Sequence, residues 1–207
     1  MNKQVISIID YGLGNLNSIK RKLDRLSINA IITSSISQIK NSDKLILPGV
    51  GHFLSGMHNL KRLNLDTILN ELVQVKKMPI LGICLGMQLM TENSEEGNCK
   101  GLGWIKGSII KFRVSDNNKF KIPHIGWNSI EKHQNHPLIN NINQHELFYF
   151  VHSYHAHFIP DQYILTKTSY DYSFISSFAK DNIMGTQFHP EKSHDQGDIF
   201  LKNFAKL

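Results

Sequence analysis

In the first half of the chain, short apolar runs alternate with longer stretches that are apolar on one side only. The apolar runs predict buried parallel strands, at residues 5–9, 30–33, 44–47 and 79–83. Between them, apolar residues recur at helical spacing over residues 16–26 and 66–77, which predicts two amphipathic helices. Strands that alternate with helices in this way are typical of an α/β fold with a mostly parallel central sheet flanked by helices.

The pattern changes from about residue 105, where runs become short, β-branched or aromatic, and broken by Asn, Asp, Pro and Gly. These runs lie at residues 108–113, 127–130, 147–153, 163–168, 174–179 and 183–188. They predict a β-rich, partly antiparallel second half, closed by a helix over residues 196–205. Because no repeat, linker or low-complexity tract interrupts the sequence, we expect a single domain over residues 1–207.

Composition narrows the possible classes of protein. A chain of 207 residues with 41% apolar residues can bury one large core. The net charge of +6 is spread along the chain, and its basic clusters lie in predicted helices, which favours solvated helix faces over a nucleic-acid site. No apolar run approaches the length of a membrane span, and two cysteines are too few for a disulfide framework. We therefore expect a cytoplasmic protein that binds neither nucleic acid nor membranes.

The candidate chemistry centres on Cys84, which lies between Gly82 and Gly86 where a predicted strand meets a helix. This Gly-x-Cys-x-Gly spacing matches the strained turn that presents the nucleophile of many hydrolases. A helix N-terminus also favours a thiolate, because backbone N–H groups and the helix dipole point at it. The alternative interpretation is a buried structural cysteine, since free cysteine is among the most buried residue types.

A cysteine nucleophile needs a base and a group that orients the base, and His189 with Glu191 can supply both. The alternative is a surface histidine beside an unrelated acid, since the chain has eleven histidines. The oxyanion formed during acyl transfer would be stabilised by the backbone N–H of Leu85 and by the glycine loop that contains Val50 and Gly51.

Six segments together resemble the class I glutamine amidotransferases with a catalytic triad, and within them the glutaminase subunits of imidazole glycerol phosphate synthases. The segments are IIDYGLGN, PGVGHF, GICLGMQL, PHIGWN, YFVHSY and QFHPEKS. The resemblance implies that Cys84 attacks the side-chain amide of glutamine, while His189 acts first as base and then as acid. It also implies a glutamine-binding set, namely Gln88, Glu96, Ser153 and Tyr154. Gln88 lies one helical turn after Cys84, so both should project from the same helix face, although Gln88 can also be a residue at the edge of the core.

The resemblance further implies a heterodimer with a (β/α)8-barrel cyclase that receives the released ammonia. That partner would form imidazole glycerol phosphate, a histidine precursor, together with an aminoimidazole carboxamide ribotide. Asn15, Trp127 and Lys192 are the expected contacts with the partner, while Trp127 can equally be a core aromatic residue. Because such subunits are activated by their partner, we expect the isolated chain to hydrolyse glutamine slowly.

Other interpretations remain open at this stage. A paralogous subunit that supplies ammonia to a sugar-modifying synthase for surface glycans would keep the same chemistry and change the acceptor. A peptidase or esterase with the same triad, or a binding protein on the same fold, are the remaining alternatives. We expect no cofactor, because the third glycine of a dinucleotide motif is replaced by Asn17, and no metal, because His152 should face away from His155 and His157.

Overall fold

The first half of the chain folds as alternating strands and helices in the computed structural model, which describes residues 4–207. Its elements are β1 (Ile6–Ile9), α1 (Leu16–Arg25), β2 (Ala30–Thr33), α2 (Ile36–Lys40), β3 (Lys44–Leu47), α3 (Phe53–Arg62), α4 (Leu65–Asn70), β4 (Ile80–Ile83) and α5 (Leu85–Leu89). The four predicted strands are all present, each within one residue of its expected start. The predicted helix at 66–77 is α4 followed by a π-helical turn, Glu71–Val75, and α2 and α3 lie in segments for which no element bounds were predicted.

The second half is β-rich, as its short runs predict. Its elements are β5 (Thr91–Ser94), β6 (Cys99–Lys100), β7 (Ile105–Lys111), β8 (His124–Ser129), β9 (Glu131–Lys132), β10 (Leu147–His152), β11 (Tyr154–His157), β12 (Ile164–Tyr170), β13 (Tyr172–Lys180), β14 (Ile183–Thr186) and α6 (His194–Lys206). Each of the six predicted runs overlaps one of these strands, and α6 begins two residues before its predicted start.

The strands form one 12-stranded mixed sheet and a separate two-stranded sheet. In the large sheet, β2, β1, β3, β4 and β14 are parallel neighbours in that order. Strand β13 then pairs antiparallel with β14, β12 and β11, and β11 pairs antiparallel with β7. Strands β8 and β10 form the small antiparallel sheet. The predicted α/β class with a partly antiparallel second half is therefore confirmed.

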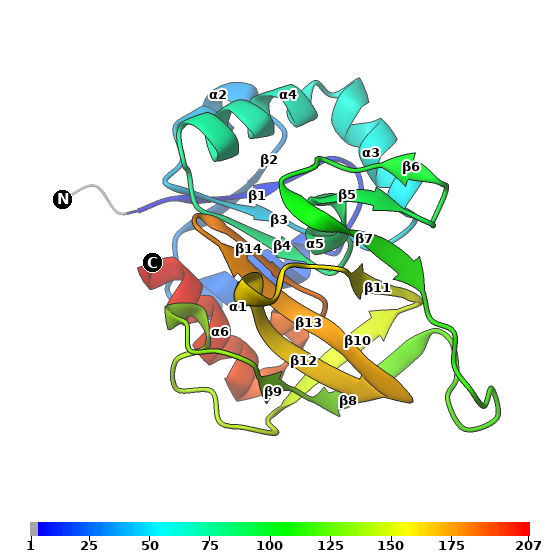
Figure 1. Cartoon of the computed structure of the whole chain (residues 1–207). Coiled ribbons are helices and arrows are strands. Elements are labelled where there is room, and N and C mark those ends of the chain that lie inside the picture. The colour runs from blue at the N-terminus through cyan, green and yellow to red at the C-terminus, as the bar shows by residue number, and fades with distance from the viewer. Residues whose placement is uncertain (1–3) are drawn as a thin grey trace.

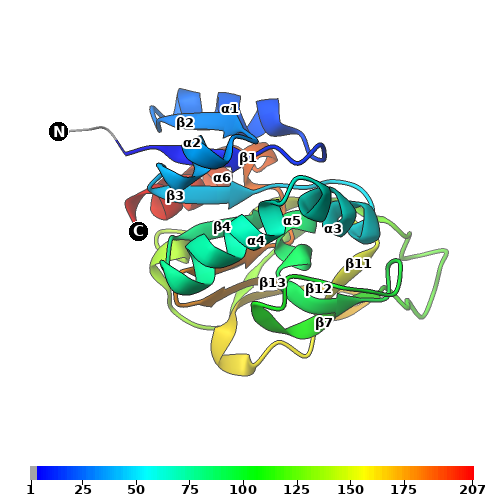
Figure 2. The same ribbon diagram turned by 90° about the horizontal axis from the view of Figure 1, so that it is seen from above.

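Helices cover both faces of the parallel strands (Figure 1). One core lies between these strands and the side that carries α3 and α4, and Figure 2 shows α2 and α4 lying over β1, β3 and β4. The second core lies on the opposite face, where Ile19 and Leu23 of α1 and Phe200 and Phe204 of α6 are buried. Across residues 4–207, no helix combines the length and apolar character that crossing a bilayer would require.

The parallel arrangement brings four distant segments to one edge of the sheet. Strands β1, β3, β4 and β14 are consecutive neighbours and run in the same direction, so their carboxyl ends lie side by side. The segments that follow them begin at Asp10, Pro48, Cys84 and Gln187. In open α/β sheets this edge is where ligands bind.

Three of the four buried histidines in the second half surround the ring of Phe112, namely His124, His152 and His155. Burial lowers the pKa of His124 and of His155 to about 4, and it lowers that of His152 well below its ordinary value. A histidine whose pKa falls on folding stays neutral in the native state, while the unfolded chain binds a proton below about pH 6.5. This part of the stability is complete above pH 6.5 and is lost as the pH falls towards 4.

We therefore expect the free energy of unfolding to decrease as the pH is lowered from 6.5 to 4.5. In the His155→Gln variant the slope over this range should be shallower by about 1.4 kcal/mol per pH unit, because one such group has been removed. Urea unfolding of both proteins at several pH values measures the two slopes. An unchanged slope would show that His155 binds its proton equally in the folded and unfolded states.

Gly197 allows α6 to pack against the turn that carries the candidate base. A Cβ atom at position 197 would lie 1.9 Å from the carbonyl oxygen of Pro190, between His189 and Glu191. We expect Gly197→Ala to lower the stability by about 2 kcal/mol, despite the better helix propensity of alanine, because the backbone must shift. Thermal unfolding should show a fall of roughly 4–8 °C in Tm. Lys202→Ala, an exposed position on the same helix, is the control and should change the stability by less than about 0.5 kcal/mol.

Candidate active site

Cys84 occupies a strained turn between β4 and α5. Its backbone has φ 52° and ψ −110°, in the region that side chains other than glycine rarely adopt. The two flanking glycines are needed for close packing: a Cβ atom on Gly86 would lie 1.8 Å from the carbonyl oxygen of Leu47, and one on Gly82 would lie 2.6 Å from the backbone nitrogen of Met87. The turn thus has the geometry that presents a nucleophile at the start of a helix.

The thiol of Cys84 is 5% exposed and lies between two polar groups. Its Sγ is 3.8 Å from the carbonyl oxygen of Val151, and Nε2 of Gln187 donates to Sγ at 3.6 Å. The sequence analysis did not identify Gln187. The available signal was its place in QFHPEKS, two residues before His189 at the end of β14.

His189 and Glu191 form a buried hydrogen-bonded pair. Nδ1 of His189 is 2.8 Å from Oε1 of Glu191, and their side chains are 3% and 2% exposed. Nε2 of His189 is also buried and finds no hydrogen-bond partner among residues 4–207. The structure therefore places an orienting carboxylate on one ring nitrogen and leaves the other free to exchange a proton.

Burial by itself lowers the pKa of His189, but the negative charges of the Cys84 thiolate and of Glu191 outweigh it and raise the pKa above its ordinary value. This balance favours the protonated imidazole. The structure thus brings Cys84, His189 and Glu191 together, although 105 residues separate the cysteine from the histidine in the sequence.

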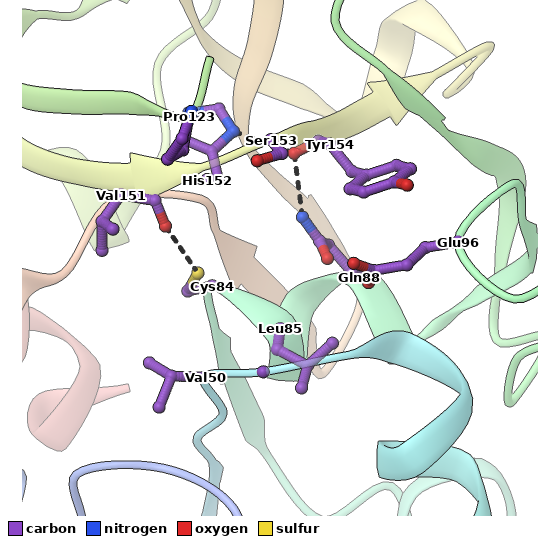
Figure 3. Close-up of a pocket in the computed structure, with 11 residues that line it drawn as sticks. Val50, Cys84, Leu85, Gln88, Glu96, Pro123, Val151, His152, Ser153 and Tyr154 are labelled. Carbon is purple, nitrogen blue, oxygen red and sulfur yellow. Dashed lines mark hydrogen bonds between the residues drawn. The ribbon is translucent and has the colours of Figure 1, made fainter.

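A cavity of about 230 Å³ opens beside the thiol of Cys84 (Figure 3). Its lining includes the predicted nucleophile, all four predicted glutamine-binding residues and the three predicted oxyanion residues, together with three that were not predicted as site residues. The lining residues are Val50, Gly51, Cys84, Leu85, Gln88, Glu96, Pro123, Val151, His152, Ser153 and Tyr154. The cavity has the size of a pocket for a small metabolite, and its polar groups converge on one side of the thiol.

Gln88 is held in the pocket wall by its amide nitrogen, which donates to the carbonyl oxygen of Tyr154 and to Oε1 of Gln187, both at 3.0 Å. With both amide hydrogens used, a contact from Gln88 to a ligand falls to its Oε1. The carboxylate of Glu96 accepts a hydrogen bond from the backbone of Phe53 at 2.8 Å, which fixes it at the rim. The pocket thus offers an anionic group opposite the nucleophile.

The predicted oxyanion donors do not converge in this conformation. The backbone N–H of Leu85 donates to the carbonyl oxygen of Gly49 at 3.3 Å. Because the C=O and N–H of a trans peptide point in opposite directions, the N–H of Val50 points away from Leu85. The hydroxyl of Tyr11 donates to the carbonyl oxygen of Pro48 at 2.6 Å and holds the start of this loop. Rotation of the Gly49–Val50 peptide would release the Leu85 donor.

The three residues expected to contact a partner lie at different degrees of exposure. Asn15 is exposed and caps α1, accepting a hydrogen bond from the backbone of Ser18 at 3.3 Å. Trp127 is 44% exposed and stacks on His194, so it is not a core aromatic residue. Lys192 is partly exposed, with its amine 5.3 Å from the ring centre of Tyr149. Over residues 4–207, no three His, Cys, Asp or Glu side chains are arranged to hold a metal ion.

Comparisons with known proteins agree with this geometry. Residues 7–206 match the model of the family described as Glutamine amidotransferase class-I. The chain is 50% identical to Imidazole glycerol phosphate synthase subunit HisH 2 of Methanococcus maripaludis, over 98% of this chain and 99% of that protein. It is 45% identical to subunit HisH 1 of Campylobacter jejuni, over 98% and 100% of the two chains.

Among solved structures, the fold is similar to PurLQS from Thermotoga maritima, with a TM-score of 0.76 and 17% identity, covering 99% of this chain and 98% of that one. A structure described as a glutamine amidotransferase gives a TM-score of 0.75 at 14% identity, covering 98% and 99%. At these identities the solved structures support only the fold. The family model and the HisH relatives match nearly the whole sequence and support membership of the family. The chain therefore belongs to the class-I glutamine amidotransferase family.

Proposed function

We propose that this chain is the glutaminase subunit of an imidazole glycerol phosphate synthase, which releases ammonia from glutamine and passes it to a cyclase subunit. The observation that carries the proposal is the buried His189–Glu191 pair beside a strained cysteine at the mouth of a small pocket. The HisH relatives, at 40–50% identity, support the cyclase subunit as the acceptor of the ammonia.

In the proposed reaction, the Cys84 thiolate attacks the side-chain amide carbon of glutamine and forms a C–S bond. The carbonyl electrons move onto oxygen, and the imidazolium of His189 gives its proton to the leaving nitrogen as the C–N bond breaks. Ammonia leaves and a thioester remains. His189 then takes a proton from the water that attacks the thioester. The C–S bond breaks, which restores the thiolate and releases glutamate, whose new carboxyl group loses its proton to solvent. The enzyme is left with the thiolate and imidazolium with which the reaction began. Glu191 keeps the imidazole oriented and stabilises its charge throughout.

The pocket chemistry supports glutamine as the substrate. The carboxylate of Glu96 is placed to pair with an α-ammonium group, which distinguishes a free amino acid from a peptide. Ser153 and Tyr154 line the same wall and can hold the α-carboxylate, while Gln88 fixes the carbonyl of Tyr154. A peptidase would need an open cleft on this side in place of a carboxylate at the rim.

Apolar and basic side chains near the pocket support a protein partner. Three apolar residues of the small sheet are exposed, namely Ile125 by 59%, Trp127 by 44% and Leu147 by 51%. Arg21, Arg25 and Lys192 line a neighbouring hollow that also touches Glu191. An apolar patch bordered by positive charge fits a partner with an apolar contact and an acidic rim. We infer that the barrel cyclase binds here, contacting Asn15, Trp127 and Lys192.

We infer that residues 1–207 form one amidotransferase domain and that this domain acts in the cytoplasm. The family match over residues 7–206 supports the first statement, and two free thiols, Cys84 and Cys99, fit a reducing compartment.

Removing the nucleophile should abolish glutaminase activity. We expect Cys84→Ala to lower kcat for glutamine hydrolysis at least about 1000-fold, measured as glutamate release with the cyclase subunit present. Cys99→Ala is the matched control, because it removes the second thiol, which lies on β6, and it should keep wild-type activity. Activity that survives in Cys84→Ala would remove this cysteine from the mechanism.

The chain alone should turn over slowly, because the Leu85 N–H is bonded to Gly49 and cannot stabilise an oxyanion. An unavailable donor of this kind costs roughly 100-fold in kcat, so we expect a rise of that order when the cyclase subunit and its ribotide substrate are added. Glutamate release and imidazole glycerol phosphate formation are measured in the same reaction. Full activity of the purified chain without any partner would contradict this expectation.

A second acceptor deserves a direct test, because two relatives of this chain, HisH 1 and HisH 2, occur in one strain of Methanococcus maripaludis at 46% and 50% identity. Two copies in one organism allow one of them to serve another synthase. The same assay with a sugar-modifying synthase distinguishes the two: stimulation by that synthase and not by the cyclase would assign the chain to surface-glycan synthesis.

A further inference from the structure

Two buried histidines that take no part in the proposed reaction lie directly behind the substrate pocket. His124 on β8 and His152 on β10 are a cross-strand pair, and they are 3% and 6% exposed. Nδ1 of His124 lies 3.0 Å from Nε2 of His152. His152 lines the cavity, and Figure 3 shows its ring turned away from Cys84.

The partners of the two rings determine where each proton lies. Nδ1 of His152 is 2.8 Å from the carbonyl oxygen of Tyr154, which can only accept, so this nitrogen carries a hydrogen. In a neutral ring Nε2 of His152 then accepts, and Nδ1 of His124 must donate to it. Nε2 of His124 is left as an acceptor, and Nδ2 of Asn128 lies 3.3 Å away with hydrogens to donate. The four groups form one directed chain, Asn128 to His124 to His152 to the Tyr154 carbonyl.

The surroundings are consistent with this chain at both ends. Nδ2 of Asn128 also donates to the carbonyl oxygen of Ser169 at 2.9 Å, and its Oδ1 accepts from the backbone of Ser129 at 2.8 Å, so the orientation of the amide is fixed. Burial keeps both imidazoles neutral by lowering their pKa. A second proton on His152 would set two N–H groups against each other across the 3.0 Å contact, and a second proton on His124 would do the same across the 3.3 Å contact with Asn128.

The chain ends on an atom that the active site uses. The carbonyl oxygen of Tyr154 also accepts from Nε2 of Gln88 at 3.0 Å, and Gln88 continues through Gln187 to the thiol of Cys84. One residue before His152, the carbonyl of Val151 faces the same thiol at 3.8 Å. The segment 151–154 therefore forms the pocket wall, and His152 is its anchor to β8.

We propose that His124 is a positioning residue, which, through the His124–His152 hydrogen bond, holds the wall at residues 151–154 in the geometry that binds glutamine. The inference rests on the proposed function of the pocket, since it assigns the wall to substrate binding.

If His124 served only to pack against its neighbours, a different set of substitutions would be tolerated at position 124. The His124 ring stacks on Tyr170 and Phe150, with centroid distances of 4.1 and 5.1 Å, so phenylalanine would preserve the stack and lose the donor. Asparagine would lose the stack and place an amide N–H near the position of Nδ1. The two roles thus predict opposite rankings of His124→Phe and His124→Asn.

The kinetic test measures kcat and KM for glutamine with the cyclase subunit present. We expect His124→Phe to raise KM about 10-fold, the effect of losing one buried hydrogen bond, with a smaller change in kcat. His124→Asn should stay within about threefold of the wild-type KM. Tyr170→Phe, which removes a hydrogen bond to the carbonyl of Lys121 from the same ring cluster, is the control and should leave KM unchanged. A KM in His124→Phe equal to or below that of His124→Asn would overturn the proposal.

The spectroscopic test needs no activity. In ¹⁵N spectra of the isolated wild-type chain near neutral pH, both rings should appear as neutral tautomers with the hydrogen on Nδ1. Their signals are assigned by their loss in His124→Asn and His152→Asn. An Nε2–H tautomer or a charged ring at either position would show that the proposed chain of hydrogen bonds does not exist. If the wild-type protein does not hydrolyse glutamine at all, the proposed function is wrong. The ¹⁵N measurement still shows whether the hydrogen bonds from Asn128 to the Tyr154 carbonyl are present.

Discussion

The close approach of Gly86 to the end of β3 is the contact on which the site depends. With no Cβ at position 86, the start of α5 rests on the carbonyl of Leu47, where a methyl group would come within 1.8 Å. Next to this contact the backbone of Cys84 is strained, with φ 52° and ψ −110°. The contact also sets the Leu85 N–H against the glycine loop after β3, so one packing constraint places both the nucleophile and its neighbouring donor.

The same contact also sets the surroundings of the Cys84 thiol and of the Leu85 N–H. Interaction with Cys84 and Glu191 raises the pKa of the His189 imidazole above its ordinary value and so favours its protonated form. The Leu85 donor, however, is bonded to Gly49, so the charge that develops on the substrate oxygen has no partner there. The orientation of the Gly49–Val50 peptide determines whether the Leu85 N–H is free to donate. A partner that binds near Val50, which is 38% exposed, would act on this peptide directly.

The second half of the chain supplies the wall of the pocket, and it does so with polar groups that are buried. Such groups stabilise a structure only when each hydrogen-bonding atom has a partner. The facing ring nitrogens of His124 and His152 bond to each other, and His152 and Gln88 both donate to the carbonyl oxygen of Tyr154. The small sheet of β8 and β10 therefore presents Trp127 and Ile125 outwards while its inner face carries the histidine that supports the pocket.

The sequence by itself determined most of the strands, the helices α1, α4 and α6 and the residue types of the chemistry, because these follow from local spacing. The short strands β5, β6, β9 and β11 and the helix α3 were not predicted. The period of apolar residues predicts β1 to β4 and α1, and Gly82, Cys84 and Gly86 predict the turn between β4 and α5. Local spacing also favoured His189 and Glu191 as a pair, since only Pro190 lies between them. It did not predict Gln187 or His152 as pocket residues, nor whether Trp127 is exposed.

Only the tertiary structure decided those points, because they depend on pairing between segments far apart in the sequence. Gln187 reaches Cys84 because β14 returns parallel to β4, and His152 meets His124 because β10 and β8 pair in one register. The bond between Leu85 and Gly49 likewise depends on which way one peptide plane faces. Gly49, on one side of that peptide, allows its ψ angle to suit either orientation, so the choice falls to the contacts made in the folded chain.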